Sequence, residues 1–220
     1  MLYRVVQSVL RFIFPRYFDW TVEGAHHLPD DGPAILVSNH VNYLDPLAMG
    51  VVFDRPLHFM AKKELFEHPL FGWLLRKVYA FPVRRGQADR QAIRHALRIL
   101  ADGHVLALFP EGTRSATGRL QELQRGVAML ALRSGAPVVP MVLLGAHEAL
   151  AGGRKVPRRG PLTVRVGPPL WFDNDVVNSP AVTEASRRIH EAMASLYPNG
   201  PAGGRGPAVA SHNAFAARKG

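Results

Sequence analysis

The sequence predicts an α/β fold: a single domain with a mostly parallel central sheet flanked by helices. Three observations support this prediction. Short apolar runs typical of buried strands alternate with longer segments of helical periodicity. The chain has 220 residues, which is enough for one full hydrophobic core. Its composition, 47% hydrophobic and 20% charged, is that of a globular protein rather than of a disordered chain or an integral membrane protein.

Composition also excludes several kinds of site. The absence of cysteine excludes disulfides, thiolate metal sites and a cysteine nucleophile. A formal net charge of +10 favours an anionic partner, either nucleic acid, anionic lipid or a phosphorylated metabolite. No apolar run approaches the roughly 18 residues that span a bilayer, and Arg11 interrupts the only N-terminal stretch that resembles a signal peptide. We therefore expect a peripheral protein on the cytoplasmic face of the cell membrane.

Residues 1–18 are predicted to form an amphipathic, membrane-surface helix. Arg4, Gln7, Ser8 and Arg11 follow helical spacing and form a polar stripe whose charges are all positive. Such a helix suits a lipid interface, with its aromatic residues toward the lipid and its arginines toward the headgroups. The alternative is a helix packed on the domain's own core. The interface interpretation predicts that deleting the helix releases the protein from anionic vesicles and leaves the α/β domain folded.

The remaining elements follow in alternation after a polar connection over residues 21–33. The predicted strands cover residues 34–37, 57–61, 79–83, 104–109, 137–144 and 162–166, and the last of these alternates like an edge strand. The predicted helices cover residues 47–53, 62–77, 87–101, 122–134 and 183–196. Residues 198–220 are rich in Gly, Pro and Ala and contain no acidic residue, which predicts a disordered tail.

The turn after the first of these strands carries candidate chemistry. His40 ends the strand, and Asp45 lies five residues further on, so the two side chains can meet across a tight turn. The carboxylate would then hold the imidazole in one tautomer, and the free ring nitrogen would act as a general base. Asp45 before Pro46 is also the pattern of a helix start, with Asp as N-cap. The two roles are compatible, because one oxygen can cap the helix while the other faces the ring.

Cations occupy the loops after other predicted strands. They are Lys62 with Lys63, Arg84 with Arg85, and Arg114 within the run Glu111-Gly112-Thr113-Arg114. Gly112 would let the backbone approach a ligand closely, and Arg114 could bind a phosphate through two parallel hydrogen bonds. Each cation alone is equally consistent with a solvated surface charge. Together they predict a site for a phosphate-bearing substrate.

Several motifs are absent from the chain. It has no G-x-S-x-G elbow, no P-loop, no G-x-G-x-x-G and no histidine pair at zinc-ligand spacing. We therefore expect neither a metal nor a cofactor. A base and several cations without an obvious protein nucleophile predict that the base activates a substrate hydroxyl directly.

Four ordered blocks resemble a known family. They are Asn39-His40 with Asp45, Phe81-Pro82-Val83-Arg84-Arg85, Phe109-Pro110-Glu111-Gly112-Thr113-Arg114-Ser115, and Val139-Pro140 with Gly145 beyond. In this order they resemble the glycerolipid acyltransferases, of the 1-acyl-sn-glycerol-3-phosphate acyltransferase type. The resemblance runs from about residue 20 to residue 196, and it defines an acyltransferase domain over residues 19–197.

The resemblance implies a reaction and its residues. A fatty acyl group would pass from acyl-CoA or acyl-carrier protein to the hydroxyl of 1-acyl-glycerol-3-phosphate, giving phosphatidate for phospholipid synthesis at a membrane that carries anionic lipid. His40 would be the general base, and Asp45 would orient it. The remaining matching positions would bind the acceptor and its phosphate: Lys62, Arg84, Arg85, Glu111, Gly112, Thr113 and Arg114. The fourth block would lie on the acyl-donor side.

Two positions depart from the family pattern. Tyr79 stands where the second block often begins with Gly, and Asn42 stands where the first block often has a small residue. Tyr79 and the breadth of the family motivate an alternative acceptor, either lyso-ornithine lipid or another lysolipid. A lesser alternative is a non-catalytic basic protein that binds membranes. Nucleic acid is not an expected partner, because the chain has no aromatic-interleaved RNA motif and no recognition-helix pattern.

Overall fold

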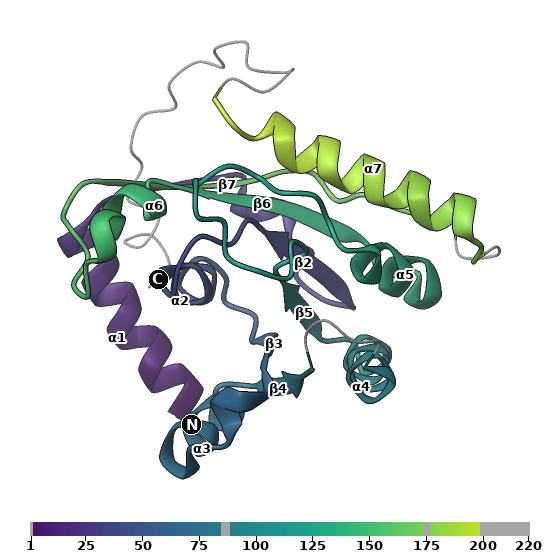
Figure 1. Ribbon diagram of the computed structural model, residues 1–220, viewed down its shortest axis with the longest axis horizontal. Coiled ribbons are helices and arrows are strands. Elements are labelled where there is room, and N and C mark those ends of the chain that lie inside the picture. Colours follow the sequence, from purple (N-terminus) through teal and green to yellow (C-terminus); the bar gives the residue numbers. More distant parts are fainter. Residues whose placement is uncertain (1, 85–88, 174–176, 199–220) are drawn as a thin grey trace, which may run out of the picture.

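The computed structural model describes residues 2–84, 89–173 and 177–198, which form the predicted α/β architecture (Figure 1). The strands are β1 (Asp19–Glu23), β2 (Ala34–Ser38), β3 (Leu57–Lys62), β4 (Ala80–Val83), β5 (Val105–Leu108), β6 (Val138–Leu144) and β7 (Pro161–Val166). The α-helices are α1 (Leu2–Tyr17), α2 (Leu44–Val52), α3 (Pro69–Lys77), α4 (Arg90–Ala101), α5 (Arg125–Ser134), α6 (Ala146–Ala149) and α7 (Ser179–Ser195).

The strands form one sheet in the order β1-β7-β6-β2-β5-β3-β4. Neighbouring strands are parallel except β6 and β7, so β7 and β1 run opposite to the other five. The carboxyl ends of β6, β2, β5, β3 and β4 therefore lie along the same edge of the sheet. In parallel sheets, ligand sites form at this edge, where the loops after the strands gather.

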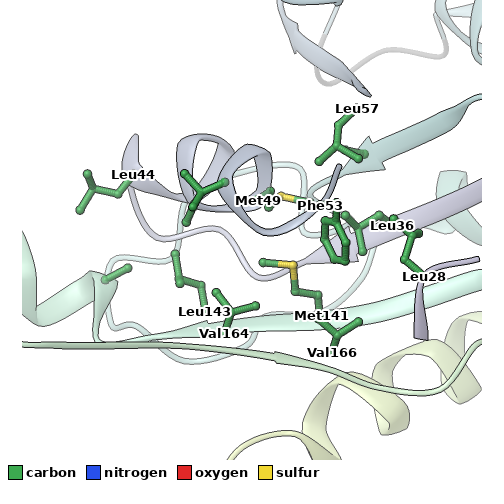
Figure 2. Close-up of a cluster of buried hydrophobic side chains, with 14 of the residues drawn as sticks. Leu28, Leu36, Leu44, Met49, Phe53, Leu57, Met141, Leu143, Val164 and Val166 are labelled. Atoms are coloured by element: carbon green, nitrogen blue, oxygen red, sulfur yellow. The ribbon is translucent and has the colours of Figure 1, made fainter. Parts of the chain in front are cut away.

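Helices cover both faces of the sheet, and the alternation of side chains along the strands assigns each residue to a face. In β2, Leu36 packs with α1 and α2, while Ile35 and Val37 point to the opposite face and pack with α4, α5 and α7. Figure 2 shows the first of these clusters, in which Met49 of α2 lies over Leu36 and Met141. The central strands are buried on both faces, and this explains why they were visible in the sequence as continuous apolar runs.

Side-chain caps set where several helices begin. The Asp89 carboxylate accepts hydrogen bonds from the amides of Gln91 and Ala92, so α4 starts at Arg90 rather than at residue 87. Asn178 caps α7, which begins four residues before the predicted start at residue 183. The predicted disordered tail lies outside the described residues from residue 199 onward. Among the helices that the structure describes, none is both long enough and apolar enough to cross a membrane.

The prediction that residues 162–166 form an edge strand is wrong. β7 lies between β6 and β1, and β1 is the edge strand on that side of the sheet. Alternation reports that one face of a strand is exposed, and it carries no information about whether its edges are paired. β1 itself was assigned to a polar connection because most of its side chains are exposed and it forms no apolar run.

Helix α1 turns part of its predicted polar stripe toward the domain. The Gln7 amide donates hydrogen bonds to the carbonyls of Gly50 and Phe53, at 2.9 Å each. The polar stripe thus satisfies carbonyl groups at the C-terminal end of α2, which lack partners within that helix. Arg4 donates a hydrogen bond to the Asp54 carbonyl, just beyond the end of α2. Arg11 donates to the Val51 carbonyl and to the Asp54 carboxylate.

The expectation that the arginines face lipid headgroups stays a prediction: Arg11 is turned toward the end of α2, whereas Arg4 stays exposed. The alternative interpretation, a helix packed on the domain's core, holds for the face that carries Tyr3, Gln7 and Phe14, all of which are buried. The opposite face of α1 is exposed and carries Val5, Val9, Phe12 and Ile13, with the Arg16 guanidinium stacked 3.6 Å from the centre of the Phe12 ring.

Candidate active site

The loop that follows β2 is anchored by Asn39, which is almost fully buried. Its side-chain oxygen accepts a hydrogen bond from the Leu143 amide at 2.8 Å, and its side-chain nitrogen donates to the Leu143 carbonyl at 3.1 Å. The Asn39 side chain thus binds both the backbone amide and the backbone carbonyl of Leu143 in β6. This pairing holds the start of the turn against the neighbouring strand.

His40 and Asp45 meet across the turn, as their spacing predicted. His40 Nδ1 lies 2.7 Å from Asp45 Oδ2, and the carboxylate is fully buried. The same oxygen accepts hydrogen bonds from the backbone amides of Val41, at 2.6 Å, and Asn42, at 2.9 Å. Because Asp45 engages Nδ1, Nε2 is the ring nitrogen left for a substrate.

The prediction that Asp45 caps α2 is wrong. The helix begins one residue earlier, at Leu44, and the Leu44 amide donates to the side-chain oxygen of Asn42 at 2.8 Å. The two amides and the imidazole all approach Oδ2 of Asp45, whereas Oδ1 is buried without a hydrogen-bond partner among the described residues. A single carboxylate oxygen, Asp45 Oδ2, therefore holds both the backbone of the turn and the His40 ring in place.

Three residues after β5 support the other side of His40. The imidazole stacks on the Phe109 ring, with centroids 4.0 Å apart and planes inclined by 18°. The His40 amide donates to Glu111 Oε1 at 2.9 Å, and its carbonyl accepts from the Ser115 amide at 2.7 Å. Backbone and ring of His40 are thus both held, which is the preorganisation a general base needs.

Glu111 makes its contacts within the protein. Its Oε2 accepts hydrogen bonds from the backbone and side-chain amides of Gln121, at 3.2 and 2.8 Å, while Oε1 binds His40. Gly112 follows with a φ of 73°, a conformation that favours glycine, and a side chain there would crowd Gln124. The resemblance grouped Glu111 with the acceptor-binding residues, and its observed contacts instead support the His40 turn.

The predicted cations lie on loops beyond this buried centre. Lys62 ends β3, is exposed, and lies 3.5 Å from the Glu64 carboxylate. Arg84 follows β4, and Arg114 lies in the loop after β5; both are exposed, as is Thr113. β5, β3 and β4 are successive neighbours in the sheet, so these loops extend away from His40 along one edge. Arg85 lies outside the described residues.

Sequence reasoning missed Tyr197, which follows α7. Its hydroxyl is buried, and burial together with the negative charges of Glu111 and Asp45 raises its pKa to about 12. The end of the last described helix therefore reaches the buried side of the His40 turn. No local pattern could have shown this, because residues from opposite ends of the chain meet there. Phe109 did have a signal, since it begins the block that contains Glu111.

The model of the acyltransferase family matches residues 19–144, more than half of the chain. This chain belongs to the acyltransferase family. The acyltransferase is 30% identical over 198 residues to the 1-acyl-sn-glycerol-3-phosphate acyltransferase of Bacillus subtilis, an alignment that covers 86% of this chain and 96% of the relative. It is 34% identical to the enzyme of that name from Limnanthes alba, over 80% of this chain and 63% of the longer plant protein.

A solved structure shares the fold. The 1-acyl-sn-glycerophosphate acyltransferase from Thermotoga maritima superposes with a TM-score of 0.72, at 23% sequence identity, over 88% of this acyltransferase and 78% of that chain. This likeness confirms the fold class, and the family model together with the relatives confirms the family identified from the four blocks. The family assignment makes the protein an enzyme, and it removes the lesser alternative of a non-catalytic membrane-binding protein.

Proposed function

We propose that this acyltransferase moves a fatty acyl group from an acyl thioester to the free hydroxyl of 1-acyl-glycerol-3-phosphate and forms phosphatidate. The observation that carries the proposal is the 2.7 Å contact between His40 and the buried Asp45 at the carboxyl edge of the sheet. The names of the relatives support the choice of acceptor. The donor is acyl-CoA or acyl-carrier protein, and no cofactor or metal is needed.

The reaction needs one base and no protein nucleophile. His40 Nε2 takes the hydroxyl proton as the acceptor oxygen attacks the thioester carbonyl. Asp45, bound to Nδ1, stabilises the imidazolium that forms. The tetrahedral intermediate collapses, the C–S bond breaks, and the proton on His40 passes to the departing thiolate. General base catalysis of this kind contributes about 10² to 10⁴ in rate.

The residues at the ends of β3, β4 and β5 and in the loops that follow would bind the phosphate of the acceptor. We assign this role to Lys62, Arg84, Arg85, Gly112, Thr113 and Arg114. Their support is the strand order, which places the described members on successive loops, and the exposure of the Lys62, Arg84 and Arg114 side chains. Arg85 is included on the resemblance alone. Glu111 would act by holding the turn.

Replacing His40 tests the proposal. His40→Gln should lower the rate of labelled acyl transfer to 1-acyl-glycerol-3-phosphate by about 100-fold or more, because the base is lost. His26→Gln, at an exposed position, is the matched control and should leave the rate unchanged. A near-normal rate for His40→Gln would show that the assignment of the base is wrong.

The structure offers another explanation for Tyr79, the residue that suggested an alternative acceptor. Tyr79 adopts a φ of 62°, in the region that favours glycine, and its ring packs 5.3 Å from the Tyr3 ring and 5.0 Å from the His58 ring. Backbone conformation thus gives a reason for glycine at this position that does not involve the acceptor. Assays with lyso-ornithine lipid beside 1-acyl-glycerol-3-phosphate would show whether the acceptor assignment holds.

We also propose that the exposed apolar face of α1 binds the membrane. Phe12→Asp should weaken binding to anionic vesicles, whereas Thr183→Asp, an equal charge on exposed α7, should not. Deleting residues 1–18 is a poor test, because Tyr3, Gln7 and Phe14 are part of the packed structure and their removal should unfold the domain. Vesicle binding that survives Phe12→Asp unchanged would count against this face.

A further inference from the structure

A cavity of about 1000 Å³ opens beside the His40 turn. It lies between the end of β6, helix α6, the loop before β7, the end of α7 and residues 117–120 of the loop after β5. In the sheet, β6 and β7 lie on one side of β2, whereas β5, β3 and β4 lie on the other. Lys62 and Arg84 therefore lie on the far side of β2 from β6 and β7, whereas the loop that carries Arg114 also reaches the cavity, through residues 117–120.

The inner wall of the cavity belongs to the candidate active site. Val41 directly follows His40, and the amide of Leu143 is the group that binds Asn39. Tyr197 completes this wall. A smaller hollow of about 340 Å³ shares Val41 and His147 and includes Ser115, whose amide binds the His40 carbonyl. A ligand in this space would therefore lie against the turn that carries His40.

The rim of the cavity is basic. Arg119, Arg158 and Arg159 are exposed and line it, together with one carboxylate, that of Glu148. The Arg159 guanidinium lies 5.3 Å from the centre of the Tyr17 ring, and the Arg158 backbone amide donates to the Ala149 carbonyl at 2.7 Å. A mostly apolar wall below a rim with three arginines suits a flexible, neutral arm that ends in a phosphate.

We propose that this cavity binds the phosphopantetheine arm of the acyl donor, an inference that rests on the proposed transfer from a thioester. The phosphate would lie against Arg158 and Arg159, and the arm would pass over Val41 and Leu143. The thioester would then approach His40 from the β6 side, and Lys62 and Arg84 would hold the acceptor phosphate from the side of β3 and β4. Acyl-CoA and acyl-carrier protein share this arm, so the cavity serves either donor.

Neutralising the two arginines tests the assignment. Arg158→Gln with Arg159→Gln should raise the KM for acyl-CoA and for acyl-carrier protein roughly tenfold, because charge-assisted hydrogen bonds to phosphate are lost. The KM for 1-acyl-glycerol-3-phosphate should stay within about twofold. The rate with an acyl-N-acetylcysteamine thioester, which has the thioester but no phosphate, should not change. A rise confined to the acceptor KM, or to acyl-CoA alone, would overturn the assignment.

Three further variants separate charge from folding. Arg154→Gln with Lys155→Gln changes the same loop outside the cavity lining and should leave both KM values unchanged. Arg158→Gln alone keeps the contact between Arg159 and Tyr17, so it should show part of the effect in a fully folded enzyme. Arg158→Lys with Arg159→Lys keeps the charge and should recover most of the donor affinity. No recovery at all would contradict a phosphate contact.

A binding measurement separates this inference from the identity of the acceptor. Calorimetry should show that the wild-type enzyme binds 4′-phosphopantetheine more tightly than pantetheine, and that the difference disappears in the Arg158→Gln, Arg159→Gln variant. This result would stand even if 1-acyl-glycerol-3-phosphate proved not to be the acceptor. Equal binding of the two compounds by the wild-type enzyme would overturn the inference while leaving the proposed reaction intact.

Discussion

The two regions that make up the candidate site differ in how their polar groups are satisfied. Around His40, between β2 and β5, the side chains of Asp45 and Glu111 are buried and bonded to the protein. Along β3 and β4, Lys62 and Arg84 are exposed. The buried region is organised when the chain folds, whereas the exposed cations keep their hydration until an anion arrives. The first region should therefore govern kcat, and the second should govern KM.

Asp45→Asn should have the largest effect. The variant keeps the shape of the side chain but loses the charge that would stabilise protonated His40, so kcat should fall by about 10² to 10⁴ with little change in KM. Steady-state kinetics with the acceptor varied would measure both constants. Asp54→Asn, on an exposed carboxylate, is the control. If Asp45→Asn raised KM and left kcat unchanged, the proposed difference between the two regions would be wrong.

Glu111→Gln should affect stability as well as activity. In any orientation of the new amide, its NH₂ group would face a present donor, either the His40 amide or those of Gln121. The free energy of unfolding should fall by about 1–3 kcal/mol, measured by denaturant titration, with a smaller loss of kcat than for Asp45→Asn. Glu122→Gln, at the exposed neighbouring position, should change neither. If the variant showed a higher KM for the acceptor and unchanged stability, Glu111 would be an acceptor-binding residue.

Arg114→Gln should show the behaviour of the exposed region. We expect the KM for 1-acyl-glycerol-3-phosphate to rise about three- to tenfold, with kcat nearly unchanged and with a smaller difference at high salt, because exposed charges are screened. Arg133→Gln, an exposed arginine of α5, is the matched control. If kcat falls and KM does not, Arg114 belongs with the buried region.

The smallest effect concerns His58, a half-buried histidine of β3. Burial, with the charges of His104 and His95, lowers the His58 pKa to about 4. The unfolded chain binds this proton near pH 6.5 and the folded chain does not, so stability should decrease as the pH falls from about 6.5 to 4. Because the side chain is only half-buried, screening reduces this loss to about 1 kcal/mol.

His58→Phe would isolate this contribution. The dependence of the unfolding free energy on pH, measured between pH 7.5 and pH 4.5, should become shallower in the variant. His68→Phe, on the exposed N-cap of α3, offers a comparison at a histidine of ordinary exposure. Identical slopes for wild type and His58→Phe would contradict the lowered pKa.

The sequence by itself was sufficient for features that depend on neighbours along the chain. The apolar runs of the central strands are visible because burial on both faces leaves no polar position. The contact between His40 and Asp45 follows from five residues of spacing, since a tight turn offers few conformations. The backbone conformation at Tyr79 and the cap at Asp89 are also local, although the predicted start of the helix at residue 87 missed this cap. In each case the backbone of one short segment determines the geometry.

The tertiary structure alone decided which segments meet. Glu111 bonds to His40 across 71 positions of sequence, because β5 lies next to β2. The same holds for β7, whose two neighbours no periodicity could reveal, and for Tyr197 beneath the turn. In α1 the pattern indicated a polar stripe, but the free carbonyls at the end of α2 determined that Gln7 and Arg11 turn toward the domain. Periodicity shows that a helix has two different faces, and only the groups packed against it determine which face is buried.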